Sequence, residues 1–259
     1  VESIEVTVSD TDLIPAGVGT NASRSMVRAG TAVVEAVIEL IENGTSVAAQ
    51  FLEAAAEDIE FSDGEFRVTG TDRTVDLTDV AKESVSEDGT KGSLTVHRHH
   101  KGEATTYPNG CHICEVEIDP ETGAIDIIAF TVVDDVGRAI NPMIVHGQSQ
   151  GAIAQGVGQA LMEIGAYDPD SGQLISGSYM DYCLPRAGDL PSIEPIQHDV
   201  PSPTNPLGVK GAGEGGTTGA PSAVMNAITH ALAPLGAPQV DMPATPQAIW
   251  RAIHSASGS

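Results

Sequence analysis

The chain has 259 residues, and its 36 acidic and 12 basic side chains give a formal net charge of −24 at pH 7. This balance argues against nucleic acid and anionic membrane surfaces as partners, because both would repel so acidic a protein. No apolar run approaches the length of a membrane span. The three cysteines are an odd number and favour a reducing compartment, so we expect a cytoplasmic protein.

The first third of the chain predicts a strand, two helices and a hairpin. Residues 1–8 are β-rich with partial alternation, which is typical of a strand. Because the chain opens on Val1 inside this apparent strand, we interpret it as a fragment, a processed product or one piece of a split subunit. A long helix is expected to end near Gly44, followed by a second helix at 46–56 and a hairpin at 57–69.

A group of hydroxyls and one arginine precedes the first helix. Ser23, Arg24 and Ser25 stand where this helix begins. Hydroxyls, a guanidinium and the free N–H groups of a helix start can together hold a phosphate. The structural alternative is an ordinary serine-capped helix, since capping serines are routine.

A polar connection and a second hairpin follow. Residues 71–106 contain clustered histidines at 97–100, but no carboxylates or cysteines at ligand spacing, so we predict a solvated loop rather than a metal site. Residues 111–133 then predict two strands joined by a turn at 119–123, and the second strand is apolar on both faces, as in a central strand. Cys111 and Cys114 lie three apart on a strand, so their side chains point to opposite faces and cannot share a zinc or redox site.

The next predicted helix is rich in glycine and glutamine. Asn141 is a plausible cap for it, with Pro142 at its first position. A glycine inside a helix costs about 1 kcal/mol relative to alanine, so several of them indicate close contact with a cofactor or with another backbone. The glycines are Gly147, Gly151, Gly156 and Gly158, and the glutamines include Gln148, Gln155 and Gln159. Tight helix packing through small residues is the competing explanation for most of these glycines.

The most informative stretch is the glycine-rich segment at 206–221. Five glycines fall between Gly208 and Gly216, with Glu214 among them and Lys210 nearby. A carboxylate placed by backbone rather than by a flexible stem is a candidate general base. We expect a helix to start just afterwards, with Thr217 or Thr218 as its cap, and another helix after Thr245 and Pro246. The alternative is a flexible surface loop.

Three segments resemble one known family. Residues 12–25, 135–160 and 208–221 are similar to the molybdenum hydroxylases, that is, the xanthine dehydrogenase and aldehyde oxidase family, and especially to the large-subunit type of aerobic carbon monoxide dehydrogenase. The resemblance covers nearly the whole chain apart from residues 71–106. It corresponds to the C-terminal part of a much longer molybdenum subunit.

The resemblance implies a role for each residue of these motifs. Glu214 would be the active-site base beside molybdenum, and Gln148 would hydrogen-bond the cofactor near the metal. Cofactor binding is implied for Ser23, Arg24 and Ser25, which would hold a phosphate, and for Lys210, Gly211 and Gly213 of the glycine-rich segment. No residue of this chain would bind the metal directly.

The resemblance also implies an α+β fold, in which mixed or antiparallel sheets and hairpins are covered by long helices, as in the second molybdopterin-binding domain of the family. Residues 1–70 would form the first half with the phosphate-holding loop, 71–106 a variable connection, and 107–259 the second half with the catalytic loop. The implied cofactor is molybdenum-molybdopterin in its cytosine dinucleotide form, with a 2Fe-2S iron–sulfur cluster and FAD on partner subunits. A hetero-oligomer is implied, which would include the N-terminal portion of the molybdenum subunit, as a separate chain or removed.

Three functions follow in order of preference. The first is part of an oxidoreductase that oxidises a small molecule with water-derived oxygen and is inactive without the N-terminal portion; carbon monoxide, an aldehyde and an N-heterocycle all remain open as substrates. The second is a non-catalytic cofactor-binding or assembly subunit. The third is a phosphate-binding module, which would leave Glu214 without a role because a carboxylate repels phosphate.

Overall fold

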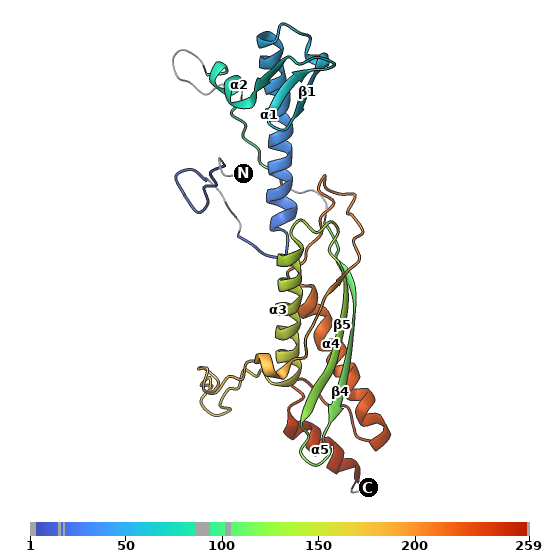
Figure 1. Ribbon diagram of the computed structural model, residues 1–259. Helices are drawn as coiled ribbons and strands as arrows, with labels where there is room; N and C mark the ends of the chain where they lie inside the picture. Colours follow the sequence, from blue (N-terminus) through green and yellow to red (C-terminus); the bar gives the residue numbers. More distant parts are fainter. Residues whose placement is uncertain (1–3, 15–16, 18, 86–93, 102–104, 258–259) are drawn as a thin grey trace. The chain divides into compact units, whose positions relative to one another are not determined.

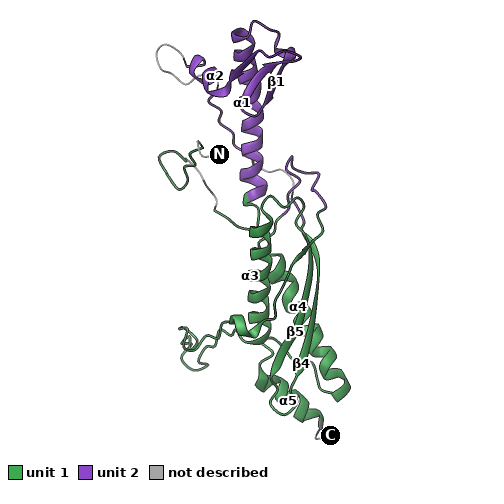
Figure 2. Cartoon of the chain, viewed as in Figure 1, with its two compact units in different colours: residues 1–25, 108–199, 211–259 green, residues 26–107, 200–210 purple. Residues whose placement is uncertain are grey.

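The structure is a computed structural model that describes residues 4–14, 17, 19–85, 94–101 and 105–257 (Figure 1). The chain divides into two compact units, drawn in different colours in Figure 2. Unit 1 comprises Val1–Ser25, Pro108–Asp199 and Gly211–Ser259, and unit 2 comprises Met26–Tyr107 and Val200–Lys210. No helix within the described residues is long and apolar enough to cross a membrane. The functional division at residues 70 and 106 stays a prediction.

Unit 2 combines one long helix, a small antiparallel sheet and a short helix. In chain order its elements are a π-helical turn (Met26–Gly30), α1 (Thr31–Phe51), a 3-10 turn (Ala56–Asp58), β1 (Ile59–Ser62), β2 (Glu65–Val68), β3 (Thr74–Asp76) and α2 (Leu77–Glu83). The sheet has the order β1-β2-β3 with antiparallel pairs. The hairpin predicted at 57–69 is confirmed, and Asp63 and Gly64 at its turn both have positive φ, as a tight hairpin turn requires.

The two helices predicted before this hairpin are in fact one. The prediction that a helix ends near Gly44 and a second occupies 46–56 is wrong, because α1 runs without a break to Phe51. Gly44 is buried, and a Cβ at this position would lie 2.5 Å from Cζ of Phe66, which is fully buried in β2. The glycine therefore makes room for an aromatic ring and does not end the helix.

Two side chains of the segment at 97–100 interact with α1. Arg98 forms an ion pair with Glu39, and His100 Nδ1 lies 3.1 Å from Glu35 Oε1. The prediction of a solvated loop is confirmed for the described residues 95–101, which form no helix or strand: within 97–100, His97, Arg98 and His99 are exposed, and only His100 is partly buried. Within the described residues, no three histidine, cysteine or acidic side chains form a group that could hold a metal ion.

Unit 1 is a three-stranded sheet covered on one side by helices. In chain order its elements are β4 (Asn109–Ile118), β5 (Ile125–Asp135), α3 (Pro142–Leu161), a 3-10 turn (Ala187–Asp189), β6 (Ile196–Gln197), α4 (Gly215–Leu232), a 3-10 turn (Ala233–Leu235) and α5 (Pro246–Ser257). β4 and β5 pair antiparallel, and β5 and β6 pair parallel. The α+β class with mixed and antiparallel sheets is thus confirmed, as are the hairpin at 111–133 and the caps Asn141 and Thr245.

Two strand predictions need correction. Residues 4–8 form no strand in this structure, and residues 1–3 of that prediction lie outside the described part; the side chains of Ile4, Val6 and Val8 are exposed. A strand needs a hydrogen-bonding neighbour, and β propensity alone does not supply one. β5 is central in its sheet, as predicted, but only one of its faces is buried: Ile127 is 9% exposed and Ile128 is 56% exposed.

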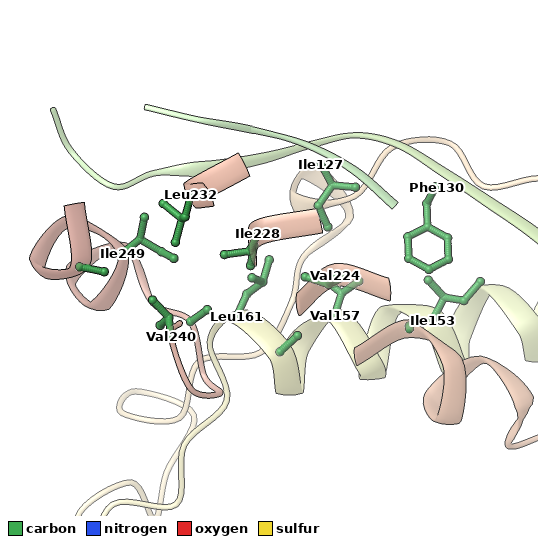
Figure 3. Packing of buried hydrophobic residues seen from close by; sticks show 14 of the residues in the cluster. Ile127, Phe130, Ile153, Val157, Leu161, Val224, Ile228, Leu232, Val240 and Ile249 are labelled. Atoms are coloured by element: carbon green, nitrogen blue, oxygen red, sulfur yellow. The ribbon is translucent and has the colours of Figure 1, made fainter. Parts of the chain in front are cut away.

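The core of unit 1 lies between the helices and the inner face of the hairpin (Figure 3). α4 contacts both α3 and β4, and α5 adds Ile249 to one end of the core. α3 and α4 pack closely because small residues face each other: a Cβ on Gly156 would lie 2.8 Å from Cβ of Ala220. By contrast, a Cβ on Gly147 or Gly151 would meet no described heavy atom within 4 Å. Helix packing thus explains the glycine at 156 and leaves those at 147 and 151 unexplained.

Candidate functional site

Glu214 lies at the start of a helix rather than in a free loop. The prediction that α4 begins after Thr217 or Thr218 is wrong: α4 begins at Gly215 and Glu214 is its N-cap residue. Thr218 Oγ1 donates back to the carbonyl of Glu214, and Thr217 Oγ1 donates to the carbonyl of Ala152 on α3. The carboxylate of Glu214 makes no capping bond and is exposed beside the positive end of the helix.

The early start of α4 has a packing cause. A Cβ on Gly216 would lie 2.7 Å from the amide nitrogen of Ile153, 2.8 Å from Cβ of Ala152 and 2.9 Å from the carbonyl oxygen of Ser149. Gly215 and Gly216 look like loop residues in the sequence. In the structure, Gly216 allows the first turn of α4 to rest directly on the backbone of α3. The position of Glu214 is therefore set by contact between two helices.

Three segments distant in sequence meet just before Glu214. A Cβ on Gly213 would lie 3.1 Å from Gln148 Oε1 and 3.2 Å from Ser23 Oγ. One on Gly211 would lie 2.9 Å from Cβ of Ser23. Ser23 has a left-handed backbone with a φ of 51°, which is uncommon outside glycine. We call Ser23, Gln148, Gly211 and Gly213 the glycine cradle; all four belong to unit 1.

The other predicted site residues are Arg24, Ser25 and Lys210. The hydroxyl of Ser25 is 2.7 Å from the hydroxyl of Thr20. Arg24 Nε is buried and has no hydrogen-bond partner within the described residues, which is rare for a buried guanidinium donor. Lys210 is half-buried and ends the 200–210 segment of unit 2, one residue before Gly211.

A buried polar network that the sequence does not predict lies next to this site. Asp134 of β5 is 6% exposed, and its carboxylate lies 3.2 Å from His112 Nε2 on β4 and accepts a hydrogen bond of 3.0 Å from Ser149 Oγ on α3. The sequence feature that could have indicated this network is an acidic pair, Asp134 and Asp135, at the end of an apolar strand. Nothing in the local sequence connects this pair to His112 or Ser149.

The glycine cradle combines several polar groups. It brings the Ser23 hydroxyl and the Gln148 side-chain amide close to the backbone of Gly213, next to the exposed carboxylate of Glu214. The hydroxyl and the amide can hydrogen-bond a polar ligand, and the carboxylate can accept a proton from a group beside it. The exposed carboxylate favours a cofactor-binding domain over a simple phosphate-binding module, because a carboxylate repels phosphate.

Comparisons with known proteins agree with this class. Residues 1–191 match the family model of the molybdopterin cofactor-binding domain. The chain is 38% identical over 254 residues to the 6-hydroxypseudooxynicotine dehydrogenase complex subunit gamma of Paenarthrobacter nicotinovorans, covering 96% of this chain and 32% of that protein.

Two solved structures share the fold. A Cu,Mo-CO dehydrogenase superposes with a TM-score of 0.87 at 31% identity, covering 95% of this chain and 31% of that one. Quinoline 2-oxidoreductase from Pseudomonas putida 86 superposes with a TM-score of 0.78 at 36% identity, and the match covers 91% of this chain and 31% of that chain. The chain spans about a third of the length of the curated relatives it matches.

The chain belongs to the molybdopterin cofactor-binding domain family of the molybdenum hydroxylases. The resemblance to the carbon monoxide dehydrogenase large subunit is confirmed at the level of family and fold.

Proposed function

We propose that this chain supplies the general base and one wall of the cofactor site in a molybdenum-dependent oxidoreductase. The observation that supports this most is the convergence of Ser23, Gln148 and Gly213 immediately before Glu214. When bound, the molybdenum cofactor would supply the redox chemistry. Gln148 and Ser23 would orient it through hydrogen bonds, and Glu214 would accept a proton at a carboxylate oxygen.

The residues present fit such a cofactor. Gly211 and Gly213 let the loop pack directly against Ser23 and Gln148, which brings that hydroxyl and that amide close to Glu214. Gly147 and Gly151 leave one face of α3 bare within the described residues. The buried, unpartnered Nε of Arg24 is a donor without an acceptor, which a phosphate oxygen would provide. We propose that Ser23, Arg24 and Ser25 hold the phosphate of a cytosine dinucleotide form, that Lys210 assists, and that no side chain of this chain binds the metal.

The substrate class proposed for the first test is an N-heterocyclic compound. One relative at 38% identity is named for 6-hydroxypseudooxynicotine and another at 37% for nicotine, and a structure at 36% is named for quinoline. The carbon monoxide dehydrogenase structure is at 31%. A general base also has a clear use at an electron-poor ring carbon, where an oxygen nucleophile must lose its proton. Aldehydes and carbon monoxide complete the panel to be assayed.

The partners proposed are those of a hetero-oligomer in the cytoplasm. One relative is described as the gamma subunit of a complex, and the chain spans about a third of the curated relatives it matches. We propose that a further cofactor-binding portion completes the site, and that subunits with a 2Fe-2S cluster and FAD carry the electrons away. The three free cysteines, Cys111, Cys114 and Cys183, are compatible with a reducing compartment.

The test is Glu214→Gln in the complex purified from its native cells, with Glu117→Gln as control. Both changes remove one negative charge from an exposed side chain, but Glu117 lies on β4 away from the cradle. We expect kcat to fall about 100- to 10,000-fold for Glu214→Gln, with molybdenum retained, because general bases contribute factors of this size. Unchanged turnover would refute the assignment of the base. Absence of molybdenum from the native complex would instead favour a non-catalytic assembly subunit.

A further inference from the structure

A buried carboxylate joins three elements of unit 1 directly under the candidate site. Asp134 is held between His112 of β4 and Ser149 of α3. A carboxylate can only accept hydrogen bonds, so His112 donates from Nε2 and Ser149 donates from Oγ. His112 Nδ1 is buried and has no partner within the described residues, and the ring also packs edge-on against Phe130, 5.8 Å between centroids. The ring is thus fixed by one hydrogen bond and by packing.

Both ends of this network support the first turns of α4. A Cβ on Gly219 would lie 2.8 Å from Cγ and Nδ1 of His112, so the helix backbone rests on the imidazole ring. The carbonyl oxygen of Ser149 lies in the same way against Gly216. Glu214 precedes Gly216 by two residues and Gln148 precedes Ser149 by one. The two candidate site side chains therefore lie within two residues, along the chain, of Gly216 and Ser149.

The composition of the network favours a positional role over a purely stabilising one. Burying a carboxylate is costly even when it is hydrogen-bonded, and apolar side chains of similar volume often stabilise a core as well or better. Two hydrogen bonds to one carboxylate, however, fix β4 and α3 relative to β5 with directional contacts that apolar side chains lack. Residues that act in a reaction need their supports fixed to within a fraction of an ångström.

We propose that His112, Asp134 and Ser149 form a positioning network, which fixes the N-terminal turns of α4 against α3 and thereby sets the separation of Glu214 and Gln148. The three residues are positioning residues and do not touch the reacting atoms. This inference rests on the proposed function for its catalytic consequence, but its structural part concerns only the contacts within unit 1.

The test compares His112→Phe with His112→Gln in the native complex. Phenylalanine keeps a ring under Gly219 but removes the donor to Asp134, whereas glutamine restores an N–H donor at a similar distance from the backbone. We expect His112→Phe to raise the amide hydrogen exchange rate of residues 218–224 in α4 at least fivefold, with little change in α5, and His112→Gln to stay within twofold of the parent. For any substrate of the panel that is turned over, kcat should fall about 10- to 100-fold with KM nearly unchanged, since misplacement by about 1 Å has effects of this size.

A second pair of variants covers the case in which His112→Phe does not fold. Ser149→Ala removes the other donor to Asp134 with a smaller change of volume. Ser176→Ala is its matched control, because Ser176 is also buried and its hydroxyl accepts one hydrogen bond, from Ala166 N at 2.9 Å, in the segment after the C-terminal end of α3. We expect faster exchange in residues 218–224 for Ser149→Ala and no change there for Ser176→Ala.

The outcomes separate this inference from the proposed function. Equal exchange in α4 for Ser149→Ala and Ser176→Ala, or identical behaviour of His112→Phe and His112→Gln, would overturn the positioning network whatever the activity shows. If exchange rises in α4 as expected but Glu214→Gln retains full turnover, the network stands and the general-base assignment fails.

Discussion

Replacing Gly216 with alanine tests whether packing, rather than helix propensity, sets the position of Glu214. The new methyl carbon would lie 2.7 to 2.9 Å from three atoms of α3, two of which belong to the backbone. Ordinary contact begins near 3.4 Å, so α4 would have to retreat by about 0.7 Å, or α3 by the same amount. Overpacking of this kind costs about 1 to 3 kcal/mol.

Gly215→Ala is the matched control for this change. It lies in the same turn, and a Cβ there would meet no described heavy atom within 4 Å. Both substitutions gain up to about 1 kcal/mol of helix propensity, so this gain cancels when the two variants are compared. The difference in their free energies of unfolding then measures the clash alone, and we expect Gly216→Ala to be the less stable by about 1 to 3 kcal/mol.

Urea unfolding followed by tryptophan fluorescence is the appropriate assay. Trp250, the single tryptophan of the chain, lies in α5 of unit 1, so its emission reports on the unit that contains the substitutions. The dependence of the free energy on urea should be the same for both variants, because the surface exposed on unfolding is unchanged. If the two free energies agree within about 0.5 kcal/mol, the close contact between α3 and α4 is not what positions the N-terminus of α4.

Two further predictions concern ionisable groups. Burial raises the pKa of the Cys114 thiol to about 11, so at pH 8 only about one Cys114 thiol in 1,000 is ionised. Iodoacetamide should therefore modify Cys114 far more slowly than the exposed Cys111. Equal modification rates, measured by mass spectrometry, would contradict this prediction. The pKa of Asp119, in the turn between β4 and β5, is lowered by hydrogen bonds from the Thr122 hydroxyl and the Glu121 backbone. A lowered pKa in the folded state means that the stability contributed by this carboxylate is present above about pH 4 and is lost as the pH falls further. Asp119→Asn should therefore weaken the acid dependence of the unfolding free energy. An unaltered dependence would show that the Asp119 carboxylate does not contribute to it.

Local sequence signals determined much of the fold. The caps at Asn141 and Thr245, the paired strands at 111–133 and the tight turn at Asp63 all depend on residues within a few positions of one another, and the structure confirms them. The family resemblance rested on short motifs, and the comparisons confirm the family. The roles of Glu214, Gln148 and the cradle glycines remain proposals.

The glycines show what only the tertiary structure decided. In the sequence, Gly44 looks like the end of a helix and Gly216 like part of a loop, because glycine is common in both. In the structure each instead admits a neighbour that is distant in sequence, the Phe66 ring in one case and the α3 backbone in the other. The same limit hid the network of His112, Asp134 and Ser149, whose members come from three different elements. The residues next to a glycine in the sequence can indicate a turn or a helix end. Which distant side chain or backbone occupies the space beside the glycine, and which residues hydrogen-bond a buried carboxylate, is decided only when the chain packs.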